Sequence, residues 1–171
     1  MRDKKQTFIE KLFECNQHKK RLSEAKNRLK DVMPLDVKSY NDLESLQISI
    51  IDQMIFRFSK LQDTMGEKLF PQILYLNAEE VKKMSFIDRL NRLEELELLS
   101  KDEWMSLRKN RNEIAHEYSF NQDEVVDGIN IIYKEVDNLL RIYSDIHNYC
   151  FEKFDFVGKA DILKGSKDET I

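Results

Sequence analysis

Apolar side chains recur every three or four residues near the start of the chain, the spacing that places them on one face of an α-helix. The positions of this stripe are Phe8, Leu12, Cys15, Leu22, Ala25 and Leu29. Two lysines, Lys19 and Lys26, interrupt it. The pattern predicts an amphipathic helix over residues 8–29 with one buried face.

A second helix is predicted after a connector at residues 31–39, which contains Pro34. The helical spacing of apolar residues resumes over residues 43–65. Gly66 and Pro71 follow, and both residue types disfavour the interior of a helix. We therefore expect the second helix to end there.

The apolar arc of this second helix is wider than one neighbouring helix requires. Ile48, Ile51 and Ile55 extend the stripe on one side. Apolar surface that one neighbouring helix cannot cover indicates that a second partner covers it. We expect that contact to come from another subunit, in a homodimer.

Three later helices are predicted from capping boxes, in which two side chains three residues apart each bond to the other's backbone N–H group. The pairs are Ser85 with Asp88, Ser100 with Glu103, and Asn121 with Glu124. The last of these helices keeps its apolar spacing from Val125 to about Phe154. It is expected to be the long core helix.

Together these segments predict an all-α fold, an antiparallel bundle of four long helices plus a shorter helix. The apolar pattern fades after Gly158, and the stretch that follows is mostly polar. We expect a single helical domain over residues 1–157 and a loosely ordered C-terminal tail over residues 158–171.

Composition narrows the classes of protein. With 4 Gly and 2 Pro among 171 residues, a fold rich in tight turns such as a β-sandwich is excluded. No window of 18 apolar residues exists and no signal-type stretch begins the chain, so we expect a cytoplasmic protein without a membrane partner.

The two cysteines, Cys15 and Cys150, lie far apart in the sequence. They predict buried hydrophobic side chains rather than a metal site. No cofactor is expected.

The charge is unevenly distributed. The formal net charge is −4, yet residues 1–30 carry ten Lys and Arg against four Asp and Glu. The basic segment leaves one face that could attract phosphates or an acidic partner. The alternative is an ordinary solvated helix face.

The helix that opens at Ser100 holds an unusual arginine. We project the helix at about 100° per residue, with Trp104 at the origin. The centre of the apolar face then falls at about 320° to 340°, and Arg111 falls at about 340°. A guanidinium on a core-facing stripe is costly unless it is paired or faces a solvent-filled cleft. Arg111 therefore either pairs with a carboxylate of a neighbouring helix or serves a site.

His116 projects to another side of the same helix, at about 120°, next to Asn112 at about 80°. The amide of Asn112 could orient the imidazole from one turn earlier. Arg111 and His116 are about 140° apart and cannot grip one small group from a regular helix. Either the helix ends or distorts near His116, or two copies of the chain build one pocket.

The segment Arg111-Asn112-Glu113-Ile114-Ala115-His116-Glu117-Tyr118 resembles the Arg-polar-x3-His motif of the HEPN superfamily. With Tyr118 two residues after the histidine, it is similar to the Arg-x4-His-x-Tyr form in toxins of HEPN/MNT (minimal nucleotidyltransferase) toxin–antitoxin pairs. The resemblance covers roughly residues 40–150. The fold that it implies is a homodimeric helical bundle with the motif at the subunit interface.

The resemblance implies a metal-independent endoribonuclease that acts on RNA. In that activity His116 transfers a proton, Arg111 stabilises charge on the phosphate, and Asn112 fixes the ring or a phosphate oxygen. It also implies that Tyr118 accepts AMP from a cognate nucleotidyltransferase antitoxin, which neutralises the toxin.

Two other functions stay open on the residues alone. The first is a non-catalytic helical adaptor or nucleotide-binding subunit of a nucleotidyltransferase, which the acidic net charge favours. The second is a bundle with a metal in its core, since Glu113 and His116 match the Glu-x-x-His spacing once. A carboxylate-bridged centre needs a second such helix, and the sequence contains none.

Overall fold

The structure, a computed structural model, describes residues 4–114 and 120–158. Every regular element within these ranges is a helix, which confirms the all-α prediction for this part of the chain. None of these helices is long and apolar enough to cross a membrane. In chain order the elements are α1 (Lys4–Leu29), α2 (Val37–Asn41), α3 (Ser45–Thr64), the π-helical turn η1 (Met65–Leu69), α4 (Phe70–Leu76), the 3₁₀ turn η2 (Val81–Lys83), α5 (Phe86–Glu95), α6 (Lys101–Ile114) and α7 (Gln122–Lys153).

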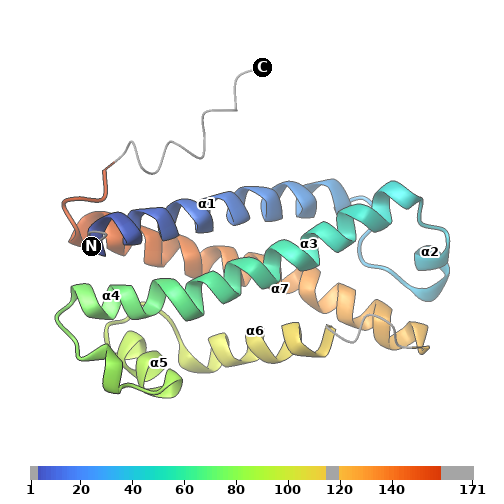
Figure 1. The fold of residues 1–171 in the computed structure, drawn as a ribbon. Helices are drawn as coiled ribbons and strands as arrows, with labels where there is room; N and C mark the ends of the chain where they lie inside the picture. Colours follow the sequence, from blue (N-terminus) through green and yellow to red (C-terminus); the bar gives the residue numbers. More distant parts are fainter. Residues whose placement is uncertain (1–3, 115–119, 159–171) are drawn as a thin grey trace.

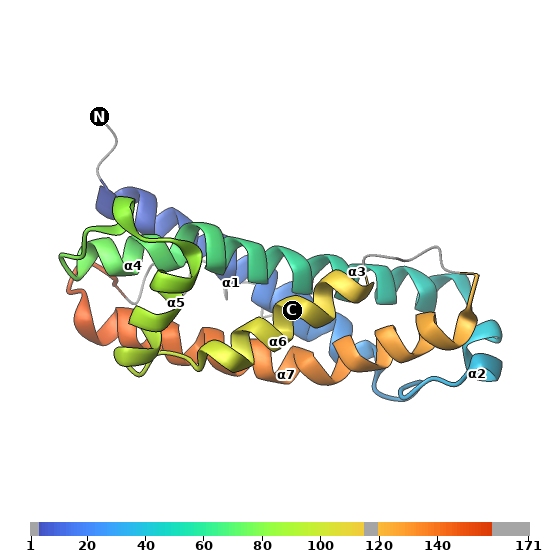
Figure 2. The same ribbon diagram turned by 90° about the horizontal axis from the view of Figure 1, so that it is seen from below.

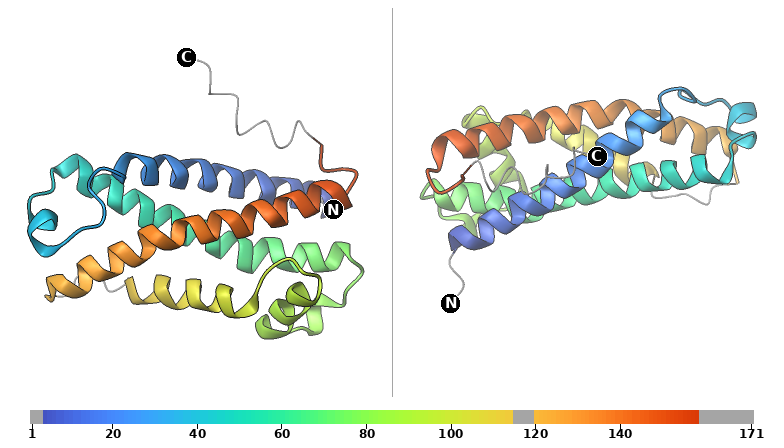
Figure 3. Two further views of the ribbon diagram at one scale, coloured as in Figure 1. Left: turned by 180° about the vertical axis from the view of Figure 1, so that it is seen from behind. Right: turned by 90° about the horizontal axis from the view of Figure 1, so that it is seen from above.

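The long helices α1, α3, α6 and α7 lie side by side, with α1 and α6 running in one direction and α3 and α7 in the other (Figure 1). Helix α3 lies between α1 and α6 in this view. From behind, α7 crosses the stack and contacts α1, α3 and α6 (Figure 3). From below, α6 lies between α3 and α7, with α5 beside its first turns (Figure 2). Helix α6 is therefore held from two sides.

The core forms along the stripes predicted for the first and last helices. All six apolar positions predicted for the first helix are buried in α1, and α7 spans the length expected for the core helix. Tyr143 of α7 is fully buried, and its hydroxyl donates to Asn16 Oδ1 at 2.6 Å. Lys26, which interrupts the stripe, pairs with Asp137 at 2.6 Å. Burial of this kind is the main stabilising contribution in such a fold.

The second helix ends as an α-helix at Thr64, close to the predicted end, but helical structure continues beyond it, which was not predicted. The chain passes from α3 through η1 directly into α4, where Phe70 N–H bonds to Met65 O, five residues back. The wider turn precedes Pro71, which has no N–H to donate and whose ring crowds the preceding turn of a helix. Gly66 is buried beneath Trp104, and a Cβ there would lie 3.4 Å from Trp104 Cζ2. Gly66 serves close packing and does not stop the helix.

Short helices are more numerous than predicted. Where we expect one, the described residues contain three, α2, α4 and α5. Helix α2 begins inside the predicted connector because Asp36 and Ser39 form a capping box, with Ser39 N–H to Asp36 Oδ1 at 2.7 Å. Helix α3 starts at Ser45, so Leu43 precedes it.

The predicted N-terminal caps lie at the starts of α5, α6 and α7. Ser85 and Asp88 form the complete capping box. At the start of α6, Glu103 N–H donates to Ser100 Oγ at 3.3 Å, while the carboxylate of Glu103 accepts from Arg141 of α7. Asn121 Oδ1 accepts from Asp123 N–H at the start of α7. The signals thus located all three helix starts.

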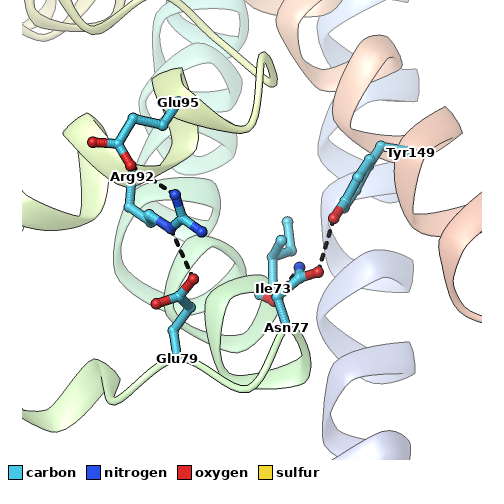
Figure 4. A network of polar contacts seen from close by, with 6 residues as sticks. All are labelled: Ile73, Asn77, Glu79, Arg92, Glu95 and Tyr149. Atoms are coloured by element: carbon cyan, nitrogen blue, oxygen red, sulfur yellow. Dashed lines mark hydrogen bonds and ion pairs between the residues drawn. The ribbon is translucent and has the colours of Figure 1, made fainter.

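A polar network closes the end of the molecule at α4 and α5 (Figure 4). Arg92 of α5 donates to Glu79 Oε1 through Nε and to Glu95 Oε2 through Nη1, each at 2.7 Å. These two carboxylates raise the pKa of Arg92. Asn77, at the end of α4, accepts from Tyr149 Oη of α7 at 3.0 Å. The network ties the loop after α4 to both α5 and α7.

The apolar arc of α3 divides between core and surface. Ile51, expected at a subunit interface, is 3% exposed and packs in the core of its own chain because it shares the stripe of Met54 and Phe58. That expectation is therefore wrong for Ile51. Ile48 stays 44% exposed, and Phe56 adds a half-exposed ring. Of the predicted tail at residues 158–171, all but Gly158 lies outside the described residues.

Candidate functional site

Helix α6 carries the candidate site. Buried side chains hold it against the core along its whole length, beginning with Trp104 near its amino-terminal end. Trp104 is buried, with its ring centroid 4.7 Å from that of Phe70. Leu107 and Ile114 are buried further along the same face. Ile114 packs against Gly128 of α7, where a Cβ would lie 3.5 Å from Ile114 Cγ1. These contacts determine which face of α6 is turned to the core.

Arg111 lies on that face, between Leu107 and Ile114, as the projection predicts. Its Nη2 donates to Asp63 Oδ2 of α3 at 2.8 Å. The side chains of Arg111 and Asp63 are 28% and 34% exposed, so the pair lies at the edge of the core. A carboxylate from a neighbouring helix therefore compensates the charge of Arg111, one of the two explanations that the sequence left open.

Asn112 is exposed and adjacent to this pair. Its Oδ1 accepts from Arg111 Nη1 at 3.4 Å, a long hydrogen bond. The other two predicted site residues, His116 and Tyr118, lie outside the described residues. The structure thus brings Arg111 and Asn112 together, and the predicted contact between Asn112 and His116 stays a prediction.

Asp63 is the site residue that sequence reasoning missed. Helical spacing places it beside the apolar stripe of α3, but nothing in the sequence indicates which helix it faces. The preceding residue, Gln62, is 3% exposed, and neither of its amide atoms has a hydrogen-bond partner in the described structure. A buried, unpartnered amide is uncommon in folded proteins. The sequence does not single out these two residues, because α3 carries other adjacent polar pairs, Asp52 with Gln53 and Ser59 with Lys60.

The two described histidines lie away from α6. Arg57 Nη1 is 3.1 Å from His18 Nδ1, and burial together with Arg57 lowers the pKa of His18. Burial also lowers the pKa of His147, with Lys19 adding to the shift. Both imidazoles are therefore favoured in the neutral form.

Metal ligands do not gather in the described part of the chain. No group of three or more His, Cys, Asp or Glu side chains there is arranged to hold a metal ion. Glu113, the carboxylate of the Glu-x-x-His spacing, is 58% exposed and lies 3.8 Å from Lys109 Nζ. The side chain of Glu113 does not face the core. The hypothesis of a metal site in the bundle core is therefore not supported at this residue. Cys15 and Cys150 are buried and free, as predicted, and burial raises the pKa of Cys150 to about 12.

Comparisons of this chain with protein-family models, with curated proteins and with solved structures find no match. The functional reading therefore rests on the motif and on the geometry around Arg111.

Proposed function

We propose that this chain is a metal-independent endoribonuclease, the toxin of a HEPN/MNT toxin–antitoxin pair, active as a homodimer with a HEPN-like fold. The position of Arg111 is the observation that carries the proposal. Asp63 orients the guanidinium at the edge of the core, and 28% of the side chain stays open to solvent. A cation held in this way is both oriented and accessible to a phosphate.

The proposed reaction needs few groups. A ribose 2′-hydroxyl attacks the adjacent phosphorus, the bond to the 5′-oxygen breaks, and the products are a 2′,3′-cyclic phosphate and a free 5′-hydroxyl. His116 removes the proton of the attacking hydroxyl or protonates the leaving oxygen, since an imidazole with a pKa of about 6.5 suits both tasks. Arg111 stabilises the negative charge that develops on the phosphate oxygens, and Asn112 holds one of them.

A two-fold axis would bring the separate parts of this site together. On one regular helix Arg111 and His116 point about 140° apart. In a homodimer the motif of one protomer faces that of its partner, so that each pocket draws on both chains. The exposed apolar side chains of α3, Ile48 and Phe56, supply a surface for such an interface.

The test is an RNA-cleavage assay with purified protein. Arg111→Ala should lower the cleavage rate about a hundredfold or more, and His116→Ala by roughly 10² to 10⁴. Lys109→Ala, on an exposed position of the same helix, is the matched control and should cleave normally. EDTA should leave the rate unchanged. Failure of the wild-type chain to cleave any RNA, or equal rates for Arg111→Ala and Lys109→Ala, would contradict the proposal.

Neutralisation is proposed to act through Tyr118. Addition of AMP there by the cognate nucleotidyltransferase places a negative phosphodiester and a bulky base near Arg111, which excludes RNA by charge and by size. Intact-mass spectrometry after co-expression should show added AMP on the wild type and none on Tyr118→Phe. Full neutralisation at an unmodified mass would mean that the antitoxin acts by binding alone.

A second candidate function is a non-catalytic adaptor that partners a nucleotidyltransferase. The Arg111–Asp63 ion pair favours it, because the charge of Arg111 already has a partner, and so does the net charge of −4. In that case Arg111→Ala would change stability or partner binding without any cleavage to lose. The same assay therefore separates the two functions.

A further inference from the structure

A pocket opens between α1 and α3, away from α6. It has a volume of about 280 Å³ and is formed by the second half of α1 and the first half of α3. Because α1 and α6 lie on opposite sides of α3 (Figures 1 and 3), this pocket is separate from the site at Arg111. Its size is near the lower end for small-molecule sites.

Two arginines line one wall of the pocket. Arg21 and Arg28 lie seven residues apart on α1, two helical turns, so their side chains leave the same face. Both are exposed, and neither forms an ion pair within the described residues. Lys11 and Lys26 of the same helix, by contrast, pair with Glu14 and Asp137. The arginines of the pocket are therefore available to an anion, and the guanidinium fork matches a phosphate.

The rest of the lining supplies different chemistry. Glu24 lies on α1 between the two arginines. From α3, Leu46 and Ile50 present an apolar surface, and Leu46 is 67% exposed. Gln53 adds an amide whose donors and acceptor make no hydrogen bond within the described residues. One pocket thus combines cationic, acidic, apolar and amide groups.

We propose that this pocket binds a nucleoside monophosphate, free or as a nucleotide unit of an RNA chain. Arg21 and Arg28 bind the phosphate, and Glu24 accepts a hydrogen bond from a ribose hydroxyl, as acidic residues do in dinucleotide sites. The base lies against Leu46 and Ile50, with its polar edge toward Gln53. A phosphate alone would leave the apolar wall and the carboxylate without a partner.

Titration calorimetry of the full chain tests this assignment, with AMP, 2′-deoxy-AMP, inorganic phosphate and a short single-stranded oligoribonucleotide as probes. AMP should bind saturably and more tightly than phosphate. The double substitution Arg21→Ala/Arg28→Ala should weaken AMP binding at least tenfold, because each removes a charge-assisted hydrogen bond. Lys30→Ala, an exposed cation on the same chain segment, is the control and should bind like the wild type.

Glu24→Gln separates a nucleotide site from a general anion site. The wild type should prefer AMP to 2′-deoxy-AMP, and Glu24→Gln should reduce that preference. Stronger binding of the oligoribonucleotide, with the same dependence on the arginines, would assign the pocket to RNA, whereas stronger binding of AMP would assign it to a free nucleotide.

Three results would overturn the inference. They are no saturable AMP binding at millimolar concentration, equal affinity for AMP and phosphate, or unchanged affinity in Arg21→Ala/Arg28→Ala with an unaltered circular dichroism spectrum. The measurement uses no cleavage, and it can be repeated in Arg111→Ala. Failure of the ribonuclease proposal therefore leaves this test intact.

Discussion

The two ends of α6 contact the rest of the molecule in different ways. The amino-terminal end is anchored by the buried ring of Trp104, and the carboxyl-terminal end forms the ion pair of Arg111 with Asp63 of α3. Trp104 is buried against Phe70 and Gly66, and burial of an indole contributes several kcal/mol. The ion pair is partly exposed, and pairs of this kind contribute about 0 to 1 kcal/mol. The ring therefore contributes more to stability than the ion pair, which lies next to the buried Ile114.

Removing the ring should have the largest effect. Trp104→Ala is expected to lower the free energy of unfolding by about 3–5 kcal/mol, since it leaves a cavity between α6, η1 and α4. Urea denaturation followed by circular dichroism measures the change. Trp104→Phe fills part of the space and should cost less. A loss below about 1 kcal/mol for Trp104→Ala would mean that the ring does not anchor α6.

The close contact between Gly66 and the ring of Trp104 can also be tested by substitution of Gly66. Gly66→Val should cost about 1–3 kcal/mol, because its extra methyl groups have to fit under Trp104. Gly66→Ala places its Cβ at an ordinary contact distance and should be neutral or slightly stabilising. Equal losses for the two variants would show that even a single methyl group does not fit beneath Trp104.

The buried amide next to Asp63 predicts a change of the opposite sign. Gln62→Met keeps the length of the side chain and removes an amide without partners, so the free energy of unfolding should rise by about 1 kcal/mol. Denaturant titration of the single variant is the measurement. Destabilisation by Gln62→Met would reveal a polar partner of that amide.

Breaking the ion pair should have the smallest effect on stability. Asp63→Asn is expected to change the free energy of unfolding by less than about 1 kcal/mol. The same variant should alter RNA cleavage, because Arg111 loses the group that orients it. Lys109→Ala provides the baseline for both measurements. A large loss of stability with unaltered cleavage would assign the pair to the fold alone.

The sequence predicted the helices and buried faces where periodicity governs them, as in α1 and α7. It failed where tertiary contacts override local rules. Gly66 and Pro71 are ordinary stop signals, yet the chain stays helical through both. The sequence also offered no signal for the ends of α4 and α5. Ala78 and Glu97 adopt the left-handed conformation there, and the residue that usually marks such an end is glycine.

The site was predictable only in part. The projection of α6 places Arg111 on the core side, and the structure agrees. Its partner could not be predicted, because Asp63 is distant in sequence and only the packing of α3 against α6 brings the two together. For Asn112 the sequence predicted a contact with His116, which lies outside the described residues, and the hydrogen bond of its amide oxygen with Arg111 was not predicted.

The π-helical turn at Met65–Leu69 also accommodates an extra residue between α3 and α4 without a break in the helical path. Such a turn holds one residue more than an α-helical turn. Loss of a single residue at the exposed positions Glu67 or Lys68 would therefore convert it into an ordinary α-helical turn and leave the downstream helix facing nearly the same way. Ile73 and Leu74 would then stay on the core face, whereas the same loss from a regular α-helix would turn them by about 100°. The π-turn is thus a tolerated insertion, and the chain can gain or lose one residue there without changing which side chains of α4 face the core.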